Sequence, residues 1–409
     1  MRVAGMITEY DPLHPGHVRL MEETRRRLGP DTGLICVMSG DFVQRGDFAV
    51  VRRGVRAAAA VESGADLVLE LPVPWAVSSA EGFASGAVGT LLATGLVTDL
   101  AFGCESGDGA ALMRLAGTLA DDGFPAALRQ ELAVGDSFAA ARQRAVGRLT
   151  SPEDAALLSR PNDLLAVEYC KCLRTSGVRP LPILRTGAPH GAEEAGEGTL
   201  PSASAIRALL RRGETEAALG LMAPAMAERF RQEMTAGRAP VFGAVCERAL
   251  LARLRSMDRP AFAALDEGRE GLSNRLYASS RTAASLAQVL AEAKTRRYAY
   301  ARLRRMVLWA YLGLTPGDRP ASVPYLRPLA MNERGRAMLA AMRGRAAAPV
   351  LTKAADVSRL GEAAKRLFDL EARAADLYTL AYPKLSAAEG GSLWREGPWV
   401  APAAERSPH

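Results

Sequence analysis

The sequence predicts a doubly wound α/β fold with a parallel central sheet, followed by a second domain that is mainly α-helical. Three observations lead to this prediction. Over residues 1–240, short apolar runs alternate with amphipathic stretches. Polar or glycine-containing segments directly follow the first four apolar runs, as ligand-binding loops do at the carboxyl ends of parallel strands. From about residue 241, strand-like runs become scarce and helical patterns dominate.

Short apolar runs bounded by polar or turn residues are typical of buried strands. Five such runs are predicted to form the sheet: Arg2–Ile7, Leu34–Met38, Asp66–Leu71, Asp99–Phe102 and Val178–Leu184. Stretches with helical spacing of apolar residues lie between them: Val18–Leu28, Ala49–Ser63, Ala80–Thr94 and Ala110–Leu119. Because parallel strands need a crossover connection, this alternation indicates parallel pairing.

The second domain is predicted from the segment RAPVFG, which begins at Arg238. Helical patterns follow it at Ala244–Ser256 and Arg281–Leu312. We therefore expect a first domain over residues 1–240 and a helical domain over residues 241–387. The last stretch, residues 388–409, is rich in Gly, Pro and Ser and is predicted to be a mobile tail.

Composition narrows the class of protein. A chain of 409 residues with 48% hydrophobic residues suits two soluble domains. A long apolar run and a signal-peptide pattern are both missing from the sequence, so we expect a cytoplasmic protein without membrane contact. The five cysteines are scattered, which disfavours structural zinc and a disulfide framework. A net charge of +7 suits a polyanionic partner but leaves nucleic-acid binding open.

The segment HPGH, residues 14–17, contains two of the four histidines and separates a predicted strand from a predicted helix. Gly16 lets the backbone approach a ligand closely, and the N–H groups at a helix start favour an anion. The imidazoles of His14 and His17 can donate hydrogen bonds to phosphate oxygens. The plainer alternative is a pair of surface or core histidines. A zinc site is disfavoured, because the HExxH pattern and further ligands are missing.

A second candidate phosphate site lies in the segment PSASAIRALL. Ser202, Ser204 and Arg207 precede or open a predicted helix, where they suit phosphate binding by the same reasoning. A helix that is simply capped by serine is the alternative.

Together these motifs resemble known enzymes. HPGH resembles the HxGH motif, and PSASAIR the S-x-[ST]-x-I-R motif, of the nucleotidyltransferase superfamily. Ten segments in order over residues 1–335 resemble the bacterial tRNA(Met) cytidine acetate ligase family: EYDPLHPGH, VMSGDFVQRGD, DLVLELPVPWAVSSAEGFASGAV, FGCES, RPNDLLAVEY, LRTGAPH, PSASAIR, GLSNRLY, TRRYAYARLRRMVLWAYLGL and VPYLRPLAMNERG. The resemblance implies an HxGH-type, Rossmann-like fold. It also implies an enzyme that uses ATP to activate acetate as acetyl-adenylate and acetylates the wobble cytidine of elongator tRNA(Met), forming N4-acetylcytidine.

The resemblance also implies an ATP site, in which His14 and His17 stabilise negative charge on the phosphates. Its expected residues are Ile7, Thr8, Glu9, Tyr10, Asp11, Pro12, Leu13, His14, Pro15, Gly16, His17, Val18, Arg19, Leu20, Gly103, Asn162, Arg185 and Thr186. Mg²⁺ is expected with the nucleotide, without a visible set of protein ligands. Asn162 alone would be interpreted as a helix N-cap. Three positions depart from the family pattern: Asp11, Leu13 and Pro15 stand where Asn, Phe and Asn are usual.

Two further segments carry candidate substrate contacts. Gln44 and Arg45 in SGDFVQRGD are candidates for binding acetate or the cytidine; the alternative is a structural loop in which Arg45 pairs with Asp41 or Asp47. The segment KTRRYAYARLRR, residues 294–305, interleaves basic and aromatic side chains, as RNA-binding surfaces do. Its RNA-binding candidates are Lys294, Arg296, Arg297, Tyr298, Arg302, Arg304 and Arg305, with Tyr300 as a second aromatic residue. A solvated helix face is the plainer interpretation of this segment.

Two other functions remain open from the sequence. One is an adenylyltransferase that acts on a small phosphorylated cofactor, although such enzymes need little beyond the α/β domain. The other is a non-catalytic RNA-binding protein, which the intact HPGH and PSASAIR segments disfavour.

Overall fold

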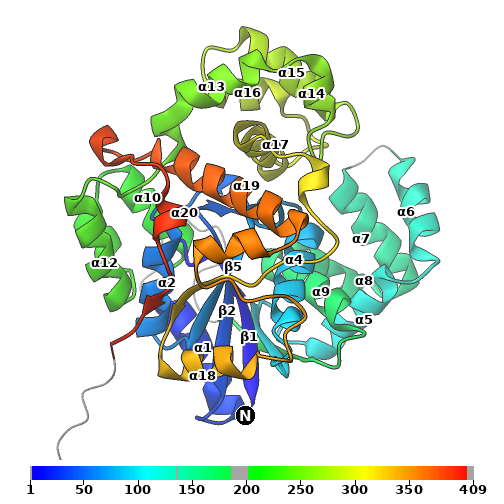
Figure 1. Cartoon of the computed structure of the whole chain (residues 1–409). Coiled ribbons are helices and arrows are strands. Elements are labelled where there is room, and N and C mark those ends of the chain that lie inside the picture. The colour runs from blue at the N-terminus through cyan, green and yellow to red at the C-terminus, as the bar shows by residue number, and fades with distance from the viewer. Residues whose placement is uncertain (1, 135–136, 186–200, 403–409) are drawn as a thin grey trace, which may run out of the picture.

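The computed structural model describes residues 2–134, 137–185 and 201–402, and its centre is a seven-stranded sheet (Figure 1). The strands lie in the order β7-β6-β1-β2-β5-β8-β9. They are β1 (Val3–Thr8), β2 (Gly33–Ser39), β5 (Leu67–Leu71), β6 (Asp99–Cys104), β7 (Arg179–Leu184), β8 (Pro328–Met331) and β9 (Trp399–Val400). A separate hairpin pairs β3 (Phe42–Val43) with β4 (Asp47–Phe48).

The five predicted strands are confirmed, and β7, β6, β1, β2 and β5 pair in parallel. All seven residues of β2 are buried, because helices cover both faces of the sheet. Leu34, Cys36 and Met38 belong to the hydrophobic core on one face, and Ile35 and Val37 belong to the core on the other. The predicted doubly wound α/β class is therefore correct.

Helices of the first part of the chain flank the sheet. They are α1 (Pro15–Leu28), α2 (Arg53–Glu62), α3 (Val73–Ala76), α4 (Ala80–Ala93), α5 (Gly109–Leu119), α6 (Phe124–Leu132), α7 (Phe138–Leu149), α8 (Pro152–Ala156), α9 (Pro161–Leu173), α10 (Ala203–Arg211), α11 (Thr215–Gly220) and α12 (Pro224–Thr235). Residues of α1, α2, α10 and α12 share one core, and residues of α4, α5 and α9 share the other. The α6–α7 hairpin lies to one side of this body (Figure 1).

The second part of the chain is mainly helical, as expected. Its helices are α13 (Glu247–Ser256), α14 (Arg259–Ala263), α15 (Leu272–Thr282), α16 (Leu286–Ala293), α17 (Tyr300–Leu312), α18 (Glu333–Ala341), α19 (Glu362–Thr379) and α20 (Ser392–Arg395). Helices α13–α17 form a lobe (Figure 1), and its core also contains residues of β3, β4, α3 and α19. Short 3₁₀ turns occur at η1 (Leu157–Ser159), η2 (Gly243–Cys246), η3 (Pro316–Asp318), η4 (Ala354–Arg359) and η5 (Leu385–Ala387).

The expected continuous helix at Arg281–Leu312 is interrupted twice. Ser285 accepts a hydrogen bond from the Gln288 N–H at 3.1 Å and starts α16 as an N-cap. Helix α16 ends before Lys294, and α17 begins at Tyr300. The first half of the basic segment is therefore a loop rather than a helix.

The end of the chain returns to the sheet, which the sequence did not indicate. Strand β8 pairs antiparallel with β5, and β9 pairs with β8. Residues 388–402, expected to be part of a mobile tail, instead contain α20 and β9. The boundary near residue 240 stays a prediction. No helix in the described ranges has the length and apolar character needed to cross a membrane.

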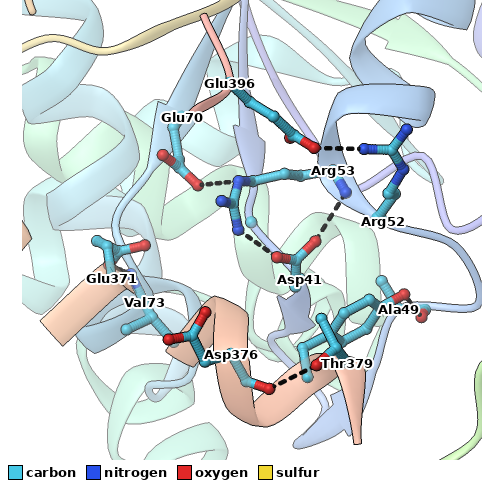
Figure 2. Close-up of polar contacts among 12 residues, drawn as sticks. Asp41, Ala49, Arg52, Arg53, Glu70, Val73, Glu371, Asp376, Thr379 and Glu396 are labelled. Atoms are coloured by element: carbon cyan, nitrogen blue, oxygen red, sulfur yellow. Dashed lines mark hydrogen bonds and ion pairs between the residues drawn. The ribbon is translucent and has the colours of Figure 1, made fainter. Parts of the chain in front are cut away.

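Buried polar contacts lie at the carboxyl ends of β2 and β5. Arg53 of α2 forms ion pairs with Asp41, which follows β2, and with Glu70 of β5 (Figure 2). The side chain of Glu371 in α19 accepts a hydrogen bond from the Val73 N–H at 2.6 Å. Polar groups this deeply buried are favourable only when they are paired, so the contact between Glu371 and Val73 helps to fix the position of α19 on the sheet.

Candidate active site

A cavity of about 1760 Å³ opens at the carboxyl ends of β1, β6 and β7. The chain passes from β1 to β2 and β5 on one side and later returns to β6 on the other side of β1. Ligands bind at this kind of switch point in doubly wound sheets. The same cavity reaches the segment of residues 294–305, so it joins the predicted ATP site to the predicted RNA site. The predicted residues that line it are Ile7, Thr8, Glu9, Tyr10, Asp11, His14, Gly16, His17, Arg19, Leu20, Gln44, Arg45, Gly103, Asn162, Arg185, Ser202, Ser204, Arg207, Lys294, Arg296, Arg297, Tyr298, Arg302, Arg304 and Arg305.

His14 and His17 start helix α1. The Nδ1 atom of His14 accepts a hydrogen bond from the Gly16 N–H at 3.1 Å, and Nδ1 of His17 accepts one from the His14 N–H at 3.3 Å. When an imidazole is neutral and its Nδ1 is an acceptor, its proton is on Nε2. Both rings are therefore arranged to donate from Nε2.

His14 is kept neutral by its surroundings. Burial lowers its pKa from 6.5 to about 4, and the positive charges of Arg185 and Arg207 act in the same direction. At neutral pH this ring is a hydrogen-bond donor without a charge of its own. The positive charge near the anion site comes from arginines instead.

The small size of Gly16 is required by the ring of His14. A Cβ atom at Gly16 would lie 2.9 Å from Cε1 of His14. Pro15 occupies the first position of α1, where a missing N–H has no intrahelical partner to lose. The departure at Pro15 is therefore compatible with the helix start.

Asp11 is not a free charge beside the predicted phosphate site. Its Oδ1 accepts a hydrogen bond from the Val50 N–H at 2.7 Å, and its Oδ2 lies 3.4 Å from Nη1 of Arg207. Arg207 also donates to the backbone oxygen of Asp11 at 2.5 Å and to Oγ of Ser204 at 3.2 Å. The positive charge of Arg207 therefore compensates the negative charge of Asp11, and its contacts link the HPGH turn to α10.

The start of α10 meets the same cavity. Ser202 is the N-cap and accepts a hydrogen bond from the Ala205 N–H at 3.0 Å. The predicted capping role of this serine is thus present, together with its place in the cavity wall. Two helix starts, those of α1 and α10, contribute to one cavity, which favours an anionic ligand.

Gly103 and Arg185 lie together at the ends of β6 and β7. A Cβ atom at Gly103 would be 3.0 Å from Cγ of Arg185, so the arginine stem covers the bare backbone. Asn162 is not an N-cap, since that position is held by Arg160. Its side-chain amide donates to Oε1 of Glu105 at 2.6 Å. Thr186 lies outside the described residues.

Four residues of the expected ATP stretch are missing from the described lining of the cavity: Pro12, Leu13, Pro15 and Val18. Leu13 is fully buried in the core that contains Met21 of α1. Its departure from the family pattern therefore concerns packing rather than ligand contact.

The turn between β3 and β4 places Arg45 in the cavity wall. Both the backbone and the side chain of Gln44 form hydrogen bonds. Its backbone N–H donates to Oε1 of Glu9 at 2.7 Å, and its side-chain amide donates to the backbone oxygen of Ser78 at 3.1 Å. Asp41 pairs with Arg53, and Asp47 pairs with Arg211. Within the described part of the chain, the Arg45 guanidinium forms no ion pair, so the alternative of a paired Arg45 is wrong.

Part of the basic segment is structural. The guanidinium of Arg305 is buried and pairs with Glu267 at 2.5 Å. Arg302 pairs with Glu270 at 2.9 Å, and the buried hydroxyl of Tyr298 donates to the Glu270 oxygen at 2.5 Å. These three side chains hold the lobe together and have little surface left for RNA.

The rest of the segment remains accessible. Arg296, Arg297, Tyr300 and Arg304 are exposed, and Lys294 is half-buried with its ammonium over the Tyr300 ring. The exposed aromatic residue is thus Tyr300, whereas Tyr298 was predicted from the sequence as the RNA-binding aromatic residue. The sequence alone missed this difference, because burial at these two positions depends on tertiary packing rather than on the neighbouring residues.

In residues 2–134, 137–185 and 201–402, no group of three or more His, Cys, Asp and Glu side chains is arranged to hold a metal ion. Mg²⁺ usually binds nucleotides through phosphate oxygens and water. The expected Mg²⁺ stays a prediction.

A parallel sheet whose first strand ends in an HxGH helix start defines a nucleotidyltransferase of the HIGH class. Consistent with this, the family model described as HIGH Nucleotidyl Transferase matches residues 1–392. The chain is 33% identical to a tRNA(Met) cytidine acetate ligase of Fervidobacterium nodosum, over 94% of this chain and 95% of that protein. It is 34% identical to the protein of the same name from Acetivibrio thermocellus, over 93% and 95%. The chain belongs to the tRNA(Met) cytidine acetate ligase family.

Solved structures agree with this assignment. The crystal structure of apo Thermotoga maritima TmcAL superposes with a TM-score of 0.93 and 32% identity, over 98% of this chain and 99% of that chain. The structure of the same protein bound with alpha-thio ATP superposes with a TM-score of 0.91 over the same shares. The family resemblance inferred from the motifs is thus confirmed.

Proposed function

We propose that this protein is an ATP-dependent ligase that activates acetate as acetyl-adenylate and acetylates the exocyclic amine of the wobble cytidine in elongator tRNA(Met). The observation that carries the proposal is the continuity of one cavity from the HPGH turn to the basic segment. An adenylate-forming site and an RNA-binding surface must share one space, because the activated acetyl group is transferred without leaving the enzyme.

The first step joins acetate to the α-phosphorus of ATP. A carboxylate oxygen of acetate attacks the α-phosphorus, and the bond to pyrophosphate breaks. The Nε2–H groups of His14 and His17 donate to oxygens of the α-phosphate and the leaving group, where negative charge builds up. Ser202, Ser204 and Arg207 bind further phosphate oxygens at the start of α10. Mg²⁺ arrives with the ATP phosphates.

Arg45 is the proposed acetate-binding residue. Attack by a carboxylate on a phosphate brings two anions together, and a positive charge beside acetate reduces their repulsion. Arg45 lines the cavity without an ion-pair partner among the described residues, whereas Gln44 is held by Glu9 and Ser78. Arg45→Gln is expected to raise KM for acetate much more than KM for ATP.

The second step forms the acetylated base. The exocyclic nitrogen of cytidine attacks the acyl carbon, the bond from that carbon to the AMP oxygen breaks, and the nitrogen loses a proton. An anticodon loop presents its bases unpaired, so the reaction needs no opening of a duplex. The exposed side chains of Arg296, Arg297 and Arg304 contact phosphates of the RNA backbone.

Two assays test the proposal. We expect exchange of labelled pyrophosphate into ATP that requires acetate, and transfer of labelled acetate to tRNA(Met). Exchange that ignores acetate but requires a phosphorylated cofactor would indicate an adenylyltransferase. Tight tRNA binding without any exchange would indicate a non-catalytic RNA-binding protein.

A further inference from the structure

The α6–α7 hairpin, which consists of helices α6 (Phe124–Leu132) and α7 (Phe138–Leu149), is not needed to build the sheet. Strands β6 and β7 are adjacent and parallel, and one crossover helix suffices to connect such a pair. Helices α5 and α9 already cover the sheet beside β6 with Leu112, Leu115 and Val167. The hairpin lies outside these helices, on the opposite side of α4 from α2 (Figure 1).

One end of the hairpin forms part of the cavity wall. Phe138 is the first residue of α7 and lines the cavity, as does Arg142 one helical turn later. Nη1 of Arg142 donates to Oε1 of Glu168 in α9 at 3.0 Å, and Glu168 is buried. Residues four apart share a helix face, so this ion pair holds the face that carries Phe138 against the cavity.

Phe138 differs from most aromatic residues of the cavity. Among the described residues, eight Phe and Tyr side chains line it, and six of these are buried: Tyr10, Phe83, Phe102, Phe124, Tyr169 and Tyr298. The other two are Phe138 and Tyr300, which are 46% and 47% exposed. Each is the first residue of its helix, and the two helices, α7 and α17, belong to different lobes (Figure 1).

The surroundings of these two rings indicate the chemistry of their ligand. Arg296, Arg297 and Arg304 are exposed on the same cavity wall as Tyr300. A ligand that fits must therefore combine negative charges with flat apolar faces. Unpaired nucleotides have both, because phosphates contact arginine while bases stack on aromatic rings.

We propose that the α6–α7 hairpin is a second RNA-binding element and that Phe138 stacks on an unpaired base of the tRNA loop, across the cavity from the basic segment. The proposal rests on the proposed tRNA substrate. It adds a contact on a lobe that the basic segment does not reach. The loop then enters between α7 and α17, and the reacting base reaches the HPGH turn at the end of β1.

The test uses Phe138→Ala and Phe138→Trp in the full chain, with KM for tRNA in the acetylation reaction as the readout. Loss of one base stack is expected to raise KM for tRNA by roughly 5- to 140-fold. Phe138→Trp should keep KM near that of the wild type. Acetate-dependent pyrophosphate exchange in the absence of tRNA is measured in both variants, and Phe138→Ala should change KM for ATP in that exchange much less than it changes KM for tRNA.

Leu149→Ala is the matched control, since Leu149 is exposed at the other end of α7 and does not line the described cavity. A KM for tRNA that stays within twofold of the wild type in Phe138→Ala would overturn the proposal. So would full rescue by Phe138→Leu, because an aliphatic side chain fills space but cannot stack. If the wild type shows no acetate-dependent exchange, the proposed ligase function is wrong. The role of Phe138 is then tested by direct binding of a tRNA anticodon stem-loop to the wild type and the variants.

Discussion

The imidazole rings of His14 and His17 lie against each other across the first turn of α1, with centroids 3.8 Å apart and ring planes inclined by 35°. Each ring accepts a backbone N–H of the helix start, so the pair forms a reciprocal capping box. In most capping boxes this role belongs to Ser or Thr with Glu or Gln. The same two side chains therefore start the helix and supply the Nε2–H donors of the proposed phosphate site.

His14→Asn separates these two roles. Asn is a strong N-cap residue and can accept the same backbone N–H groups, but it lacks a donor at the position of Nε2. We expect acetate-dependent pyrophosphate exchange to fall by about 100- to 1000-fold, the usual effect of losing one transition-state donor. The free energy of unfolding should stay within about 1 kcal/mol of the wild type.

His17→Ala gives a second measurement on the same pair. Adenylate formation should be abolished while affinity for tRNA stays nearly intact, because the ring belongs to the HPGH turn and not to the basic segment. A parallel loss of exchange and tRNA binding would contradict this and indicate a structural role for the ring.

Gly16→Ala tests whether the position of the His14 ring matters. The new Cβ would lie 2.9 Å from Cε1 of His14, so the ring must shift by a few tenths of an ångström or more. Since small displacements of catalytic groups cost up to about 100-fold in rate, we expect exchange to fall by roughly 10- to 100-fold. Thermal unfolding should change little, because Ala is favourable in a helix. Wild-type exchange in this variant would show that the ring tolerates displacement.

Gly46→Ala should weaken both the fold and the acetate site. Gly46 has φ +77°, and a Cβ atom there would lie 2.5 Å from the backbone nitrogen of Arg305 in α17. The left-handed conformation alone costs a non-glycine residue about 1–2 kcal/mol. Displacement of the adjoining Arg45 is expected to raise KM for acetate. Urea unfolding and acetate titration measure the two effects.

Gly54→Ala is the control for that substitution. Gly54 lies in α2, and a Cβ atom there meets nothing within 4 Å. Alanine in this helix should leave stability unchanged or raise it by up to about 1 kcal/mol. An equal loss of stability in Gly46→Ala and Gly54→Ala would mean that the close contact of Gly46 with α17 has no special effect.

Glu371→Gln should change how stability depends on pH. Burial raises the pKa of Glu371, and the negative charge of Glu70 raises it further, while Arg53 and Arg327 partly oppose this. At any pH between the ordinary carboxyl pKa and this raised value, Glu371 is protonated in the folded state and ionised in the unfolded state. Stability therefore falls as pH rises through this window, by up to about 1.4 kcal/mol per pH unit.

Glutamine keeps an acceptor for the Val73 N–H, which is 2.6 Å from the Glu371 carboxylate in the wild type, but carries no proton to lose (Figure 2). The variant should show a flatter stability profile between pH 5 and 8 and should be more stable than the wild type at the alkaline end. Glu362→Gln, at an exposed position of the same helix, should leave the profile unchanged. Identical slopes for Glu371→Gln and the wild type would show that the carboxyl titrates normally.

The fold was predictable where its signals are local. The apolar run Leu34–Met38 within β2 and the helix start at His14 are complete within a few residues, so both could be inferred from the sequence. Strands β8 and β9 contain four and two residues, which is too short for a periodic pattern. Strand β8 pairs with β5, more than 250 positions earlier in the chain, and β9 pairs with β8, so only tertiary packing defines the two strands.

The site was predictable to the same extent. HPGH and PSASAIR indicated which end of the sheet carries the cavity and the proposed phosphate site, because helix starts bind anions through their own backbone. The partners of Asp11 and Asn162 are distant in sequence. Asp11 forms an ion pair with Arg207, and Asn162 donates a hydrogen bond to Glu105. Burial of Tyr298 and exposure of Tyr300 depend on how α17 packs, which a loop of alternating basic and aromatic residues does not reveal.

Arg304→Gln tests the proposed RNA-binding surface through salt dependence. Arg304 is exposed in the cavity wall and, within the described ranges, forms no ion pair. Each phosphate contact releases condensed counterions, so removing one should reduce the slope of log affinity against log salt by about 0.7–0.9. Arg343→Gln removes an equal charge from an exposed position outside the cavity and should leave the slope nearly unchanged. Equal slopes for wild type and Arg304→Gln, measured by tRNA binding from 50 to 200 mM salt, would exclude Arg304 from the RNA contact and place the phosphates on other arginines.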